Sequence, residues 1–114
     1  MRTMRILTAA AIAGALLLAG CGRERVAVEL TVSARGADGA PVAAAEVVVA
    51  GRPAGATDAE GRLVVRERRQ PGEEVRVVVT AAGSRPWEGS FVVRRRDRGE
   101  TDRVALVAQL GVPG

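Results

Sequence analysis

Apolar and polar residues alternate along much of the chain from Val26 onward, and this period of two constrains the fold more than any other feature. In the segment 26–35, one set of alternate positions is Val26, Val28, Leu30, Val32 and Ala34, and the other is Ala27, Glu29, Thr31, Ser33 and Arg35. Successive side chains of a β-strand point to opposite faces, so the pattern predicts a strand with one buried and one wet face. After the N-terminal region, no segment repeats with the period of a helix.

Further Val-rich segments follow at 46–50, 62–66, 74–82, 87–94 and 103–110. The residues that we expect to face inward in the last three are Val75, Val77, Val79, Ala81, Trp87, Phe91, Val93, Val104, Leu106, Ala108 and Leu110. Residues typical of turns separate the segments at 36–41, 58–61, 70–72 and 82–86. This spacing predicts an all-β domain over residues 26–112, a small antiparallel Greek-key β-sandwich of about six to seven strands after an N-terminal signal helix.

The composition argues against an enzyme. The 114-residue chain has no His, no Lys and one Cys, so Ser33, Ser84 and Ser90 have no base to activate them as nucleophiles. Zinc and copper sites need His or Cys ligands, and the chain has no His and a single Cys. A glycosidase, which is a hydrolase, could use two carboxylates, but the pairs Glu73/Glu74 and Asp58/Glu60 lie in turns or at strand starts, where charged residues are common. We expect no catalytic residues, no metal and no cofactor.

The turn 58–61 is explained by its own backbone chemistry. Asp58 can accept backbone N–H groups across the turn, and Gly61 can adopt a positive φ before the next strand. The alternative is a calcium site at Asp58 and Glu60, but two carboxylates supply fewer oxygens than the six to eight that calcium prefers. We therefore interpret this turn as structural.

The N-terminus has the pattern of an export signal. A cationic start with Arg2 and Arg5 is followed by an uncharged stretch, residues 6–22. Its end, Leu18-Ala19-Gly20-Cys21, resembles the lipobox of bacterial lipoproteins. This resemblance implies that a diacylglycerol is attached to the Cys21 sulfur and that the chain is cleaved between Gly20 and Cys21. Residues 1–20 would then be a signal peptide and 21–25 the lipidated cysteine with a short tether. The alternative is an uncleaved signal anchor with an incidental cysteine.

Lipidation would place the protein in the cell envelope, held in a lipid bilayer by acyl chains such as palmitate on Cys21. Gly22 follows that cysteine, where an Asp retains many lipoproteins in the inner membrane, so we favour the outer membrane. An exported location and the scarcity of stacking aromatics argue against nucleic acid as a partner. We expect a protein partner in the envelope, whose identity the sequence does not specify.

Three stretches together resemble a known domain class. They are 37–42 leading into 45–49, then 56–63, then 71–77, and their order and spacing are similar to the carboxypeptidase-regulatory-like domain. The resemblance implies a prealbumin-like, Ig-like β-sandwich that acts as an accessory or spacer module, with no catalytic residues to carry over. The chain departs from the family at Ser84, where an aromatic is usual, and at 94–103, which has no counterpart.

Two arginine clusters, 66–69 and 94–98, fall in predicted loops. They can be solvated loop tips that prevent pairing of sheet edges. Alternatively, Arg94, Arg95, Arg96 and Arg98 contact an anionic component of the envelope, since guanidinium groups bind phosphate in a bidentate manner. The function predicted from the sequence is thus a membrane-anchored, non-enzymatic structural or protein-interaction module, with an anion-binding lipoprotein as the alternative.

Overall fold

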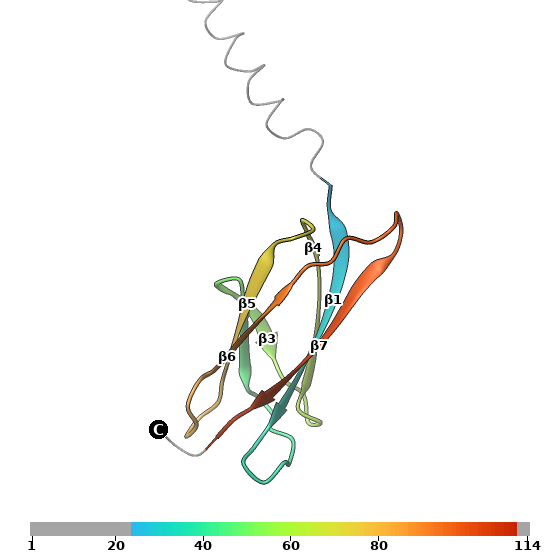
Figure 1. Cartoon of the computed structure of the whole chain (residues 1–114). Coiled ribbons are helices and arrows are strands. Elements are labelled where there is room, and N and C mark those ends of the chain that lie inside the picture. Colours follow the sequence, from blue (N-terminus) through green and yellow to red (C-terminus); the bar gives the residue numbers. More distant parts are fainter. Residues whose placement is uncertain (1–23, 112–114) are drawn as a thin grey trace, which may run out of the picture.

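The computed structural model describes residues 24–111, which form a sandwich of two β-sheets (Figure 1). Its seven strands are β1 Val26–Arg35, β2 Glu46–Val49, β3 Arg52–Ala56, β4 Arg62–Arg69, β5 Glu74–Thr80, β6 Trp87–Val92 and β7 Thr101–Gln109. The first sheet has the order β4-β1-β7 and the second has the order β3-β2-β5-β6. The predicted all-β sandwich is confirmed. Within the described part of the chain, no helix is long and apolar enough to span a bilayer.

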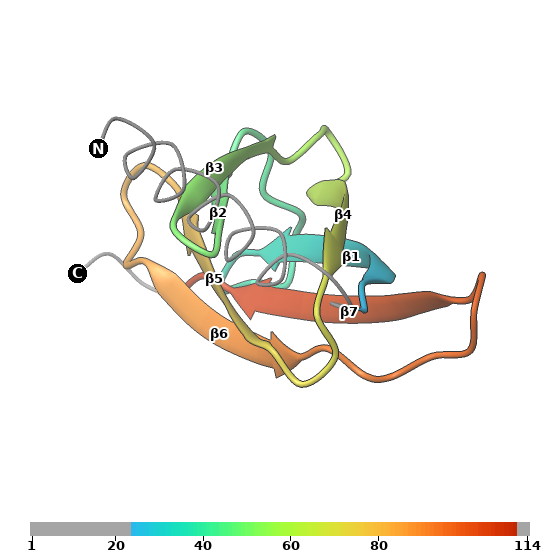
Figure 2. The same cartoon turned by 90° about the horizontal axis from the view of Figure 1, so that it is seen from above.

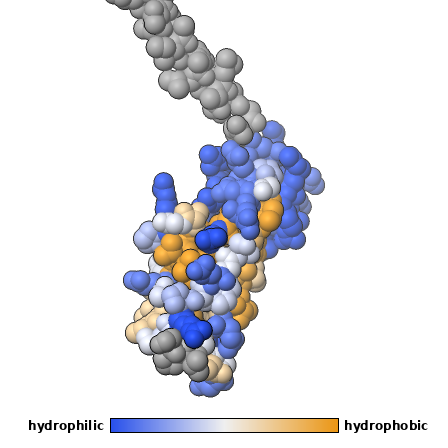
Figure 3. All heavy atoms as spheres, turned by 60° about the vertical axis from the view of Figure 1, so that its left-hand side comes forward, coloured by the Kyte–Doolittle hydropathy of each residue, from blue (hydrophilic) through white to orange (hydrophobic). Residues whose placement is uncertain are grey.

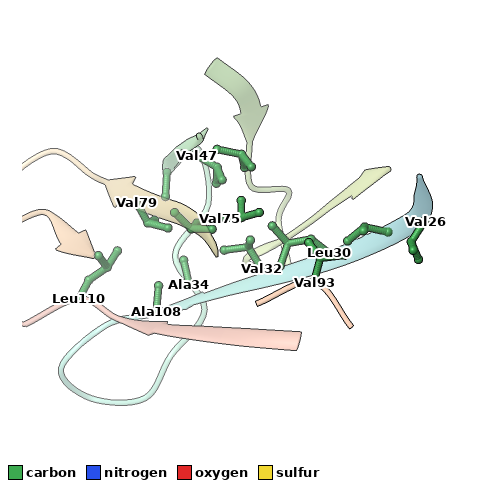
Figure 4. Packing of buried hydrophobic residues seen from close by; sticks show 14 residues of the cluster. Val26, Leu30, Val32, Ala34, Val47, Val75, Val79, Val93, Ala108 and Leu110 are labelled. Atoms are coloured by element: carbon green, nitrogen blue, oxygen red, sulfur yellow. The ribbon is translucent and has the colours of Figure 1, made fainter. Parts of the chain in front are cut away.

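The core lies between the two sheets and consists mainly of valine. The alternate positions of β1 that were predicted to face inward are all buried, as are Val75, Val77 and Val79 of β5. They form one cluster with Val93, Ala108 and Leu110 from the C-terminal part of the chain, and Figure 4 shows Val93 beside Val32 and Ala108 beside Ala34. Trp87, Phe91, Val104 and Leu106 are partly buried and pack against the edge of this cluster. Period-two alternation therefore identified the buried faces of β1, β5, β6 and β7 correctly.

One pairing differs from the expected antiparallel pattern. β1 runs antiparallel to β4 but parallel to β7, with Val28 opposite Asp102 (Figure 2). A tight hairpin forces two strands to be antiparallel, whereas strands joined by a long crossover can be parallel. β1 and β7 are the first and last strands, and β7 reaches the first sheet from β6 through the loop 93–100. The prediction of a wholly antiparallel sandwich is therefore wrong at this pair.

The prediction that 66–69 forms a loop is also wrong, because β4 continues to Arg69. Arg66 and Arg68 lie on its outer face and are exposed. Glu67 and Arg69 alternate with them and lie on the other face, where the Arg69 guanidinium contacts Glu67 at 2.6 Å and Glu73 at 2.9 Å. These ion pairs allow a charged segment to continue as a strand at the end of the sandwich.

β3 was not predicted. It is a short edge strand containing Pro53 and Gly55, residues that usually interrupt strands. Its pairing with β2 shifts register between Val47 and Val48, which marks a β-bulge. The segment forms a strand because it pairs with β2, and not because of its own residues.

The turn 58–61 has the geometry that its residues predict. Asp58 Oδ1 accepts hydrogen bonds from the N–H groups of Glu60 at 2.9 Å and Arg62 at 3.0 Å. Gly61 has a φ of 78° and is buried. Beside it, the buried Thr57 hydroxyl donates to the Val42 carbonyl at 2.7 Å, so the turn is tied to the neighbouring loop.

The signal peptide, the cleavage position at Gly20 and the lipidation of Cys21 lie outside the described residues. They stay predictions.

Candidate functional site

The arginine-rich loop 93–100 lies at the end of the sandwich where β1 begins (Figure 1). The same end carries the last residues of β4 and the first residues of β7. In Figure 3 the atoms around this end are predominantly hydrophilic, in contrast to the mixed surface further along the domain. We call this region the proximal end, because it is the end nearest in sequence to Cys21.

A buried carboxylate organises the proximal end. Asp102 lies on the inner face of β7 with 0% of its surface exposed. Its Oδ2 accepts a hydrogen bond from the Arg94 N–H at 3.0 Å, and its Oδ1 accepts one from Arg94 Nε at 3.0 Å. Arg94 Nη2 lies 2.8 Å and Arg96 Nη2 3.3 Å from the same Oδ1. Two of the predicted anion-contacting arginines therefore hold the loop to β7.

These contacts determine the charge state of Asp102. Burial is the largest single influence on this carboxyl group and acts to raise its pKa. The hydrogen bonds from the Arg94 N–H and from the guanidinium groups of Arg94 and Arg96 outweigh it, so the pKa of Asp102 is below its ordinary value. Asp102 is thus an ionised, buried group whose charge is matched by the loop.

The other two predicted arginines differ from each other. Arg95 Nη1 forms an ion pair with Glu24, just ahead of β1, and both side chains are at least half exposed. Arg98 is exposed and forms no ion pair with any residue in the range 24–111. The structure therefore brings the four arginines to one end of the sandwich but leaves only Arg98 without a carboxylate partner there.

A surface cavity of about 490 Å³ opens at the proximal end. Its charged lining comes from three separate parts of the chain: Glu24, Arg25, Arg68, Arg96, Asp97, Arg98 and Glu100. Arg68 Nη2 donates to the Arg25 carbonyl at 3.3 Å, which joins β4 to the segment before β1. The buried Nε of Arg96 has no hydrogen-bond partner among the described residues. The sequence singled out Arg68 within the cluster 66–69 but not Arg25, and nothing local to either residue indicates that it meets the loop.

The carboxylates that a hydrolase could use have structural partners. Glu73 contacts Arg69, Glu74 accepts a hydrogen bond from the Ser90 hydroxyl at 3.1 Å, and Asp58 accepts backbone N–H groups. Across the described residues, no three His, Cys, Asp or Glu side chains gather closely enough to hold a metal ion.

A second candidate surface is the edge of β7. This strand is the last of its sheet and pairs only with β1 among the described strands. Its outer face presents Ala105 and Val107, and Val107 is 59% exposed. Arg94 Nη2 donates to the Arg103 carbonyl, so the loop covers only the beginning of this edge.

No protein-family model and no curated protein sequence matches the chain. The fold is similar to solved structures of catechol 1,2-dioxygenase. The enzyme from Acinetobacter sp. ADP1, inhibited by bound mercury, aligns with a TM-score of 0.60 and 12% identity over 82% of this chain and 55% of that chain. The enzyme from Pseudomonas arvilla C-1 aligns with a TM-score of 0.55 and 16% identity over 81% of this chain and 54% of that chain. This likeness supports the sandwich fold alone, and the chain spans little more than half of each enzyme.

Proposed function

We propose that this protein is a non-enzymatic lipoprotein of the cell envelope, anchored through Cys21, whose β-sandwich binds a partner protein along the free edge of β7. The sandwich belongs, in this proposal, to the carboxypeptidase-regulatory-like class. Its two sheets and its turns at 36–41, 58–61 and 70–72 agree with the resemblance of the sequence to that class. The residue after Cys21 is Gly22, which favours the outer membrane.

The proposed anchor at Cys21 would lie close to the folded domain. Glu24 follows Cys21 by three residues, and three residues span at most about 11 Å. Acyl chains on Cys21 would therefore hold the proximal end close to the lipid headgroups. The long sides of the sandwich, including the edge of β7, would extend away from the membrane and stay accessible to other proteins.

The observation that carries the binding role is the contrast between β7 and the other three sheet edges. Proteins protect exposed edges with charges, proline, bulges or short strands. β3 contains Pro53 and pairs across a bulge, β4 carries Arg62, Arg66 and Arg68, and β6 has only six residues. β7 has nine residues, and its segment 104–108 contains no charge, glycine or proline. Its backbone is therefore the best template for an added strand.

The chemistry of this edge defines the partner. An extended segment of another envelope protein would add to β7 through main-chain hydrogen bonds and place small apolar side chains beside Ala105 and Val107. A charged segment would suit this edge poorly, because its side chains would face an apolar strip.

The anchor is tested by the intact mass of the membrane-extracted protein beside a Cys21→Ser variant. We expect a mass equal to residues 21–114 plus acyl chains, and loss of this species in the variant. An unmodified full-length mass would contradict the anchor and support an uncleaved signal anchor.

The binding edge is tested by placing a photo-crosslinking amino acid at Val107 in the native envelope. Val92 on β6 is a matched control, because it is 56% exposed against 59% for Val107 and lies on the other sheet. We expect a discrete adduct with one other protein from position 107, none from position 92, and loss of the adduct when Ala105→Lys is added. Equal labelling at both positions, or no adduct at 107, would refute the role of β7. An adduct of twice the chain's own mass would replace the partner with a second copy.

A further inference from the structure

We infer that the cavity at the proximal end binds a zwitterionic phosphoethanolamine headgroup, with its phosphate on the arginines and its ammonium on the acidic residues. The lipid source of this headgroup rests on the proposed anchor, whereas the site itself does not. The inference assigns a ligand to residues that the proposed binding edge on β7 does not use.

The arginines of the cavity include groups whose charge the fold does not neutralise. Arg98 forms no ion pair within the described chain, and the Arg68 guanidinium contacts a backbone carbonyl rather than a carboxylate. Arg25 lines the cavity beside them. Three exposed guanidinium groups around one cavity form a site suited to a phosphate, since each can donate two parallel hydrogen bonds.

Arg96 lines the cavity as well, but the fold already uses its guanidinium. Its Nη2 contacts Asp102, and its Nε has no hydrogen-bond partner among the described residues. Because that Nε is buried, a ligand in the open cavity cannot reach it, so the phosphate is assigned to Arg25, Arg68 and Arg98.

The acidic residues of the lining define the rest of the ligand. Glu24 is neutralised by Arg95, whereas Asp97 and Glu100 form no ion pair among the described residues. They are joined to each other through the Asp97 N–H, which donates to Glu100 Oε1 at 3.3 Å. A simple phosphate would be repelled by these two carboxylates. A phosphate ester that also carries an ammonium group would place its phosphate beside the arginines and its ammonium beside Asp97 and Glu100.

The size and position of the cavity agree with a lipid headgroup. A volume of about 490 Å³ lies in the range of small-ligand sites. Glu24 and Arg25, which line it, are the last two residues of the proposed tether 21–25. A lipid in the same leaflet as the Cys21 acyl chains could therefore reach it without leaving the bilayer.

The test uses the full acylated protein in phosphatidylcholine nanodiscs, titrated calorimetrically with soluble glycerophosphoethanolamine. We expect binding at least tenfold tighter than that of glycerophosphocholine, whose quaternary ammonium cannot donate hydrogen bonds to Asp97 and Glu100. Affinity should fall at least tenfold in an Arg68→Ser/Arg98→Ser double variant. It should be unchanged in the control Arg85→Ser, an exposed arginine in the turn between β5 and β6.

A further variant tests the acidic part of the lining. Asp97→Asn/Glu100→Gln should remove the preference for the ethanolamine ester. Equal binding of inorganic phosphate would overturn the headgroup assignment, and unchanged binding in the Arg68→Ser/Arg98→Ser variant would overturn the site.

The lipid source is tested by replacing phosphatidylcholine with phosphatidylethanolamine in the nanodiscs. We expect the soluble ester to compete poorly there, because the lipid already occupies the cavity. If the anchor is confirmed by mass but no ester binds, only this inference fails. If the mass shows that the native chain carries no acyl groups but the ester still binds, only the proposed anchor fails.

Discussion

Asp102 links β7 to the loop before it through four contacts with Arg94 and Arg96. Removing one partner of a buried ion pair costs more than the pair itself contributes, because the remaining charges lose their compensation. At the scale of single residues, this carboxylate is therefore a structural group, and its arginines are not free to serve a ligand as the sequence alone suggested.

Asp102→Asn should lower the free energy of unfolding by about 2 kcal/mol at pH 7, the value of hydrogen bonds to a charged group. Because the folded pKa of Asp102 is below its ordinary value, its stabilisation is present at pH above that value and is lost as the pH falls through the folded pKa. Urea unfolding at a series of pH values should show the difference between variant and native protein shrinking below about pH 4.

The control for this measurement is Glu24→Gln, which breaks the exposed pair with Arg95 and should change stability by less than about 0.5 kcal/mol. A difference between Asp102→Asn and native protein that stayed constant down to about pH 2 would show that the carboxylate charge is not what stabilises the loop.

Gly61 is required by its backbone conformation and by its surroundings. Its φ is 78°, and an added Cβ would lie 2.7 Å from the Ala34 carbonyl oxygen. Gly61→Ala should therefore cost at least about 3 kcal/mol, which combines left-handed strain with a backbone clash. Gly72 has a similar φ of 88°, but no atom lies within 4 Å of an added Cβ there. Gly72→Ala should therefore cost only about 1 kcal/mol of stability. Equal melting temperatures of the two variants would contradict this reasoning.

At the scale of elements, β6 shows how a short strand with a glycine is completed by a neighbouring side chain. Trp87 and Gly89 lie on the same face, and an added Cβ on Gly89 would lie 2.8 Å from Trp87 Cζ2. The indole therefore covers the glycine and closes the edge of the core.

Gly89→Ala should displace the indole into solvent and reduce stability by about 1–3 kcal/mol. Trp87 is the only tryptophan, so its fluorescence emission reports the displacement directly as a red shift. Ser90→Ala, on the exposed face of the same strand, should leave the emission unchanged. An unshifted spectrum in Gly89→Ala would mean that the ring does not rest on this glycine.

At the scale of the whole molecule, the first sheet is assembled from distant parts of the chain. Its central strand β1 pairs with β4 and β7, and the contact of Arg103 with Glu29 joins residues 74 positions apart. Closing such long loops before any pairing forms is entropically costly, and proteins dominated by distant contacts fold slowly.

Refolding, followed by Trp87 fluorescence after dilution from urea in a stopped-flow instrument, should therefore take milliseconds to seconds. Truncation after residue 100 removes β7 and should abolish cooperative unfolding, because β1 loses a partner along its length. Folding in microseconds, or a cooperative transition in the truncated chain, would contradict an assembly that depends on β7.

The sequence by itself determined the local properties of this protein. Period-two alternation established which faces of β1, β5, β6 and β7 are buried, because the direction of a side chain depends only on its place along the strand. The 58–61 turn was likewise predictable, since Asp58 and Gly61 act on their own backbone. The last predicted strand, 103–110, begins one residue after Asp102. Extending it by that residue would have placed Asp102 on the inner face.

The tertiary structure decided which segments meet. β3 contains strand-breaking residues and becomes a strand only beside β2, and β4 continues through its charges because residues 66–69 pair with the start of β1. The pairing of β1 with β4 on one side and β7 on the other brings Arg25, Arg68 and Arg98 around one cavity. No local pattern contains this information, because the neighbours of a strand are selected by the burial of whole sheet faces rather than by residues adjacent in sequence.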